Sequence, residues 1–154
     1  MSHMQSRPGD TEGNRFFIPA LQPVYEALLP ISETLLRVIA GFALAVHGWP
    51  KIQNPMGLTG MVESIGFAPS WFWAFALALT EFVGGILLLL GLFTRPAAAA
   101  ATVVLLVTVW FHWVLRGEGY SGAELSLIWA GVTFFFVARG GGRYSLDRAF
   151  GREF

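Results

Sequence analysis

Long apolar stretches, separated by short connectors rich in glycine, proline and polar residues, dominate the chain from residue 31 to residue 138. A helix needs about 20 mostly apolar residues to cross the hydrocarbon core of a bilayer. Four segments approach this length, and we expect each to be a membrane-spanning helix: residues 31–49, 70–93, 97–115 and 123–138. The pattern therefore predicts an all-α integral membrane protein, an antiparallel four-helix bundle with short loops.

The connectors support this division into helices. A cluster of turn residues after residue 49 ends the first segment, and Thr94-Arg95-Pro96 forms a tight turn between the second and third. Residues 16–30 are apolar but contain Pro19, Pro23 and Pro30, so we expect them to lie at the membrane surface rather than to span it. The predicted organisation is an N-terminal polar and interfacial segment (1–30), a four-helix domain (31–138) and a basic tail (139–154).

The distribution of Lys and Arg predicts the orientation in the membrane. One side of a four-span arrangement would hold six arginines, namely Arg15, Arg95, Arg139, Arg143, Arg148 and Arg152. The opposite side would hold only Lys51 and Arg116. Because basic residues concentrate in cytoplasmic loops, both termini are predicted to be cytoplasmic.

Composition narrows the possible functions. Hydrophobic residues make up 55% of the chain and charged residues only 13%, against about 25% charged in soluble domains, so the expected surroundings are a lipid bilayer. The formal net charge is zero, which gives no sign of a nucleic-acid partner. The chain has no cysteine, which excludes disulfides, thiolate metal sites and dithiol redox chemistry within it.

Two charged residues stand deep in the predicted helices. Arg37 lies about two turns into the first helix, and Glu81 lies near the middle of the second. A charge at the centre of a spanning helix costs roughly 2.5–3.5 kcal/mol on insertion scales, so it needs a partner. We expect a buried ion pair between Arg37 and Glu81, whose role is either to fix helix register or to serve function.

Five ionisable residues from four helices are predicted to share one cavity. His47 and Lys51 are four residues apart on the first helix, and His112 ends the third. Glu124 opens the fourth helix at the same face, and Glu81 lies below it. We expect the cavity to open to the non-cytoplasmic side, where its histidines could exchange protons or bind a polar group such as a quinone ring.

Other interpretations of the histidines stay open. His47 and His112 could ligate a haem, although paired histidine sites usually lie deeper between helices. Together with Glu124 they could bind a metal, but neither spacing is a specific motif, and we predict no metal site.

Several short motifs resemble the DoxX family. The match covers residues 35–147, and His112 and Glu124 correspond to polar positions of its later helices. The other matching runs are Leu36-Arg37-Val38-Ile39-Ala40-Gly41, His47-Gly48-x-x-Lys51, Glu81-x-x-Gly84-Gly85, Gly91-Leu92-x-Thr94-Arg95 and Gly140-x-Gly142-Arg143-x-Ser145-Leu146-Asp147. In this last run, Arg143 and Asp147 are expected to pair. The resemblance implies a four-helix protein of the bacterial inner membrane. Some members are small subunits of a thiosulfate:quinone oxidoreductase, whereas distant relatives are assembly factors or cargo receptors.

These observations favour a membrane component of a quinone-linked redox system, in which this chain would be an oxidoreductase subunit rather than a stand-alone enzyme. The predicted catalytic residues are His47, His112, Glu81 and Glu124, and the predicted cofactor-binding residues are Arg37, Lys51, His47 and His112. A redox-enzyme subunit and a second copy of the chain are the expected partners. The alternative is a non-enzymatic scaffold, or a small-solute carrier, in which the ionisable cluster stabilises the bundle or passes a solute.

Overall fold

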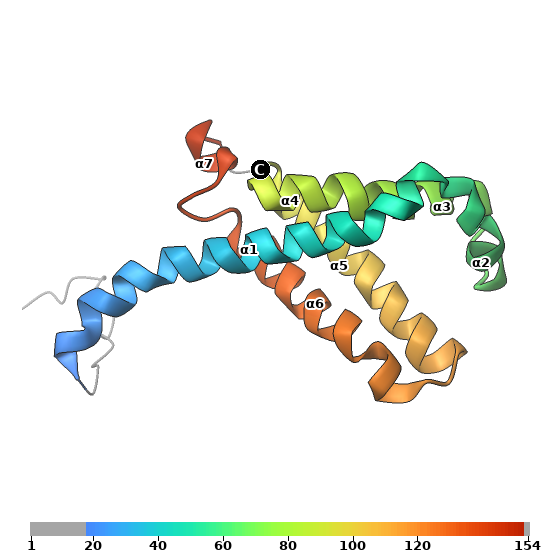
Figure 1. Ribbon diagram of the computed structural model, residues 1–154, viewed down its shortest axis with the longest axis horizontal. Coiled ribbons are helices and arrows are strands. Elements are labelled where there is room, and N and C mark those ends of the chain that lie inside the picture. The colour runs from blue at the N-terminus through green and yellow to red at the C-terminus, as the bar shows by residue number, and fades with distance from the viewer. Residues whose placement is uncertain (1–17, 153–154) are drawn as a thin grey trace, which may run out of the picture.

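The computed structural model describes residues 18–152, and every regular element within them is helical (Figure 1). Two π-helical turns lie within longer helices: η3 (Thr80–Gly84) joins α3 to α4, and η4 (Phe111–Leu115) extends α5. Short 3-10 turns, η1 (Pro19–Leu21) and η2 (Pro55–Leu58), flank the first helix. The α-helices are α1 (Gln22–Gln53), α2 (Thr59–Ser64), α3 (Ser70–Leu79), α4 (Gly85–Leu90), α5 (Thr94–Trp110), α6 (Gly119–Arg139) and α7 (Leu146–Ala149).

Four helical stretches are long and apolar enough to cross a membrane, which confirms the predicted class and number of spans. The α3–η3–α4 unit is one continuous span, and so is α5 with η4. The four stretches are Pro19–Gln53, Ser70–Leu90, Thr94–Leu115 and Gly119–Arg139. The chain is therefore a multi-pass membrane protein. Which side of the membrane holds the termini stays a prediction.

The first helix begins earlier than the prolines suggested. α1 starts at Gln22, and Pro30 lies inside it, so the expected helix start at residue 31 is wrong. Proline is tolerated within spanning helices because neighbouring groups satisfy the backbone atoms that it leaves without partners. At 32 residues and about 1.5 Å per residue, α1 is about 48 Å long, longer than a hydrocarbon core of about 30 Å. The surface location expected for its first turns stays a prediction.

α1 packs against η3 and α4 through direct contact of the two backbones. A side chain at Gly41 would overlap the backbone of Gly85 and Leu89, and one at Gly48 would overlap that of Phe82. Small residues allow this approach in lipid, where close packing replaces the hydrophobic effect between helices. The contact fixes the register of the antiparallel pair, with Gly41 opposite Leu89 and Gly48 opposite Phe82.

α5 and α6 form the second antiparallel pair. Their polar link is a hydrogen bond of 2.8 Å from Thr102 Oγ1 to Thr133 Oγ1, both buried. Figure 1 shows this hairpin slanting away from α1 and α3, so the two pairs diverge toward α2. A buried cluster from α1, α4, α5 and α6 holds the pairs together: Ala40, Leu44, Leu88, Ala98, Ala101 and Phe136.

The segment after α6 folds back onto the turn between α4 and α5. Both carboxylate oxygens of Asp147 accept hydrogen bonds there, from the amides of Phe93 (2.7 Å) and Thr94 (2.9 Å) and from the Thr94 hydroxyl (2.7 Å). The Asp147 amide in turn donates to Gly91 O (2.9 Å). Asp147 thus supplies the acceptors that the first amides of α5 need. The expected pairing of Asp147 with Arg143 is therefore wrong.

Candidate functional site

The structure separates the predicted site residues into two groups at different ends of the bundle. We call these the α7 end, where α7 covers the α4–α5 turn, and the α2 end, where the helix pairs diverge (Figure 1). Arg37 belongs to the α7 end. His47, Lys51, Glu81 and His112 belong to the α2 end. The register set by Gly41 and Gly48 explains the separation, because it places Glu81 level with the last turn of α1.

Arg37 is bonded to carbonyl groups and not to Glu81, so the predicted ion pair is wrong. Its guanidinium, only 1% exposed, donates to Leu88 O (2.7 Å), Leu89 O (2.7 Å) and Tyr144 O (2.8 Å). The last carbonyls of a helix lack partners within that helix, and Arg37 supplies donors to two of them at the end of α4. Arg37 therefore ties together α1, α4 and the returning tail, and lies outside the cavity.

An ion pair also stabilises the α7 end. Arg139, the last residue of α6, donates from Nε to Glu33 Oε1 (2.7 Å) and from its terminal nitrogen to Glu33 Oε2 (3.0 Å). This two-pronged geometry is the strong form of an arginine–carboxylate contact. It holds the N-terminal half of α1 beside the end of α6, so these two helix segments lie on the same side of the bundle.

Glu81 is paired with Lys51 instead. Lys51 Nζ lies 2.5 Å from both carboxylate oxygens of Glu81. The Glu81 side chain is 8% exposed and that of Lys51 is 29% exposed. The pair links the last turn of α1 to the middle of the second span, and its half-exposed lysine forms part of a cavity wall.

Glu81 and His112 both lie in π-helical turns. Glu81 is the second residue of η3 and His112 the second residue of η4. A π turn inserts one extra residue into a helix, changes the direction of the side chains around it, and occurs frequently at functional sites. The sequence does not predict these turns, because the apolar pattern around them is that of an ordinary spanning helix.

Four of the predicted residues line one cavity of about 280 Å³. His47 and Lys51 come from α1, Glu81 from η3 and His112 from η4. The rest of the wall comes from α1, α5 and α6: Ala43, Leu44, Leu105, Thr108, Leu125, Ser126 and Trp129. The cavity thus combines two imidazoles, an ion pair and two hydroxyls with apolar walls. Such a surface can bind a small polar group and exchange protons with it.

Glu124 is not among the residues that line this cavity. It is exposed at the start of α6, where its carboxylate accepts a hydrogen bond of 3.3 Å from the Tyr120 hydroxyl. The expected contribution of Glu124 to the cavity is therefore not seen, and the α6 residues that do line the cavity are Leu125, Ser126 and Trp129.

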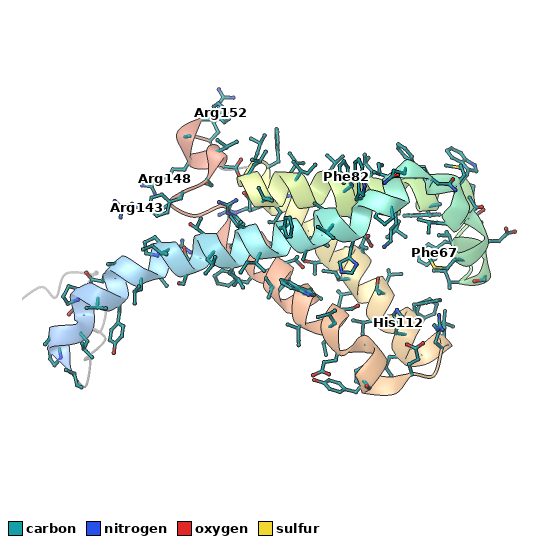
Figure 2. The ribbon with its side chains drawn as sticks, in the orientation of Figure 1. Phe67, Phe82, His112, Arg143, Arg148 and Arg152 are labelled. Atoms are coloured by element: carbon teal, nitrogen blue, oxygen red, sulfur yellow. The ribbon has the colours of Figure 1, made fainter. Side chains whose placement is uncertain are left out.

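The structure instead places Glu118 beside the cavity. Its Oε2 lies 2.6 Å from His112 Nδ1, and its Oε1 lies 2.7 Å from Arg116 Nε. The hydrogen bond with His112, assisted by the charge of Arg116, holds the pKa of the Glu118 carboxyl below its usual value. His112 lies near the end of the α5–η4 helix (Figure 2), and the chain turns back there through Gly117 and Gly119, both with positive φ. The sequence signal for Glu118 is an acidic residue between two glycines just after a helix that ends near a histidine.

Fold and site together define a class, the four-span helical membrane proteins with ionisable residues in the bundle. Within this class the chain belongs to the DoxX family, whose model matches residues 33–113. It is 32% identical over 131 residues to an uncharacterized protein of Haemophilus influenzae, covering 81% of this chain and 95% of that one. It is 26% identical over 132 residues to the inner membrane protein YphA of Escherichia coli, covering 80% and 94%.

A third relative matches only part of the chain. A Bacillus subtilis protein named "Putative oxidoreductase CatD" is 45% identical over 65 residues, which cover 42% of this chain and 47% of that one. No solved structure matches the chain.

Proposed function

We propose that this chain is a membrane component of a quinone-linked redox system in the bacterial inner membrane, and that its polar cavity holds the quinone ring. The observation that carries the proposal is the convergence of His47, Lys51, Glu81 and His112 on one cavity. Ionisable residues within spanning helices are costly and usually mark a substrate, ion or proton pathway. The names of two relatives, an inner membrane protein and an oxidoreductase, agree with this assignment.

The donors and acceptors in the cavity fit a quinone. The ammonium group of Lys51 and the ring N–H groups of His47 and His112 can donate to its two ring oxygens, and the apolar walls suit its ring faces. A bound quinone supplies two-electron, two-proton redox chemistry. The role of this chain is then to orient the ring and to move protons.

The residues divide these tasks between them. With Nδ1 of His112 bonded to Glu118, Nε2 is the ring atom that exchanges a proton with the cavity, and Glu118 connects the imidazole to the exposed loop. Glu81 holds Lys51 in place through the ion pair between them. The chain has no cysteine, so no thiol within it exchanges electrons with the quinone, and we assign that exchange to a partner subunit or to the substrate itself.

Binding of a short-chain quinone tests the proposal. The purified protein, reconstituted in quinone-free lipid nanodiscs, should bind a quinone with one isoprene unit saturably. His47→Ala and His112→Ala should each weaken binding about tenfold, since each removes a hydrogen bond to the quinone ring. Glu124→Gln changes an ionisable residue outside the cavity and is the matched control. Undiminished binding in the double histidine variant would contradict the proposal.

A second candidate function is that of an assembly partner for another membrane protein. The observation that favours it is the N-terminal half of α1, which extends beyond the bundle (Figure 1) and exposes apolar side chains along one side of the helix, among them Val24, Tyr25, Leu28, Leu29 and Ile31. A redox-enzyme subunit bound there would combine the two functions. Loss of a co-purifying subunit in the Tyr25→Ser, Leu28→Ser variant, with quinone binding intact, would support this role. A complex unaffected by these changes would exclude it.

A further inference from the structure

A second, larger cavity adjoins the first. It has a volume of about 470 Å³ and lies between α2, α3 and α5. Apolar side chains make up most of its wall, including Met61, Phe67, Leu77, Val103, Val107 and Phe111. Phe67 stands in the connector after α2 (Figure 2). We call it the apolar cavity, and the one lined by both histidines the polar cavity.

The two cavities share one wall. Lys51, Glu81, Thr108 and His112 line both of them. The ion pair and the imidazole therefore stand at the junction between a small polar chamber and a larger apolar one. A ligand held at this junction meets hydrogen-bonding groups on one side and hydrocarbon on the other.

We infer that the apolar cavity binds the hydrocarbon chain of the same ligand whose polar ring occupies the polar cavity. The ligand class is then an amphiphile with a redox-active head and an isoprenoid chain, that is, a membrane quinone with its natural tail. The inference rests on the proposed function and extends it from the ring to the chain. A polar cavity alone would suit any small solute, and an apolar cavity alone any lipid. The shared wall selects a molecule that has both parts.

The position of the apolar cavity gives the hydrocarbon chain of the quinone a route from the bilayer. Val103, on the α5 side of the wall, is 62% exposed on the outer surface of the bundle. In a spanning helix that surface faces lipid, where quinones are dissolved. The hydrocarbon chain gains little from the hydrophobic effect when it leaves the bilayer for the cavity, because the bilayer is equally apolar. The expected gain comes from close packing and is therefore modest.

The test uses a quinone that carries a photoreactive diazirine at the end of a chain of several isoprene units. In nanodiscs of quinone-free phosphatidylcholine, illumination should cross-link this probe to residues of the apolar cavity on α2, α3 and α5, such as Met61 and Val104. An excess of unlabelled long-chain quinone should prevent the cross-links. Peptide mass spectrometry locates them.

A matched pair of variants separates the chain site from the ring site. Val103→Trp adds bulk at the exposed edge of the apolar cavity and narrows its opening, and Leu106→Trp adds bulk at an exposed position on α5 outside it. Val103→Trp should weaken binding of the long-chain quinone about three- to tenfold, leaving the one-isoprene quinone unaffected. Leu106→Trp should change neither affinity.

Each other result overturns the inference in a recognisable way. Equal affinities of wild type and Val103→Trp for the long-chain quinone, with cross-links only outside the cavity, would disprove the chain site and leave the proposed function intact. Cross-links from a diazirine-labelled phospholipid that excess quinone does not displace would make the cavity a lipid site. Absence of saturable binding for both quinones would disprove the proposed function and this inference with it.

Discussion

The two ends of the bundle differ in how far their charged groups are enclosed and in what those groups contact. At the α7 end, the charged groups of Arg37 and Asp147 are almost fully enclosed and bonded to several backbone or hydroxyl groups. At the α2 end, the side chains of Lys51 and His112 are 29% and 30% exposed and line cavities. A charged group that is enclosed and whose hydrogen bonds all go to other groups of the protein serves structure. A charge with access to a cavity can act on a ligand.

The largest effect on stability is expected at Arg37. Arg37→Met removes the donors to three carbonyl groups in the α7 end. We expect the free energy of unfolding to fall by about 3–5 kcal/mol, because each buried acceptor that loses its donor costs about 1–3 kcal/mol. Thermal unfolding in detergent measures this. Arg143→Met, on the exposed tail, is the control and should change stability by less than about 0.5 kcal/mol. Equal, small losses in both variants would show that Arg37 is not structural.

The second largest effect on stability is expected at the contact between the backbones of α1 and η3. Gly48→Ala places a methyl group against the backbone of Phe82 and should destabilise the protein by about 1–3 kcal/mol, the usual range for overpacking. Gly131 lies within α6 with no atoms near the position of an added Cβ, so Gly131→Ala should be neutral or slightly stabilising. The same unfolding assay compares them. A neutral Gly48→Ala would mean that α1 and η3 are farther apart than described.

The Lys51–Glu81 pair should affect binding more than folding. Lys51→Met leaves Glu81 without its cation, so we expect a moderate loss of stability, about 1–2 kcal/mol given the partial exposure of Lys51. Binding of the short-chain quinone should weaken about tenfold. The double variant Lys51→Met, Glu81→Leu should regain the stability but not the binding. Recovery of both would assign the pair a purely structural role.

The smallest effect concerns the loop at Glu118. Because its pKa is lowered in the folded protein, its contact with His112 adds stability above the unfolded pKa of about 4.3, and this contribution disappears as pH falls through the lowered folded value. Amide NMR shifts of Gly117 and Gly119 should therefore titrate below about pH 4.3. Glu118→Gln should abolish the titration, whereas Glu63→Gln, in α2, should preserve it. A midpoint at or above the usual value would contradict the contact.

The sequence was sufficient to predict the four spans and part of the candidate site. Apolar length determined the four helices, and the spacing of His47 and Lys51 placed both on one face of α1. The sequence could not determine the register between α1 and the second span, because that register depends on where their glycines meet. That register decides that Glu81 faces Lys51 and that Arg37 faces the end of α4. The π turns and the return of Glu118 toward His112 depend on local backbone geometry that hydropathy does not encode.

The hydrogen bonds of Asp147 also impose an order on biosynthesis. The turn between the second and third spans obtains its acceptors from a residue that follows the fourth span. A ribosome must therefore have delivered all four spans to the membrane before that turn can acquire its final bonding. Until then the nascent bundle lacks the hydrogen bonds of Asp147, and the helices can still adjust against one another.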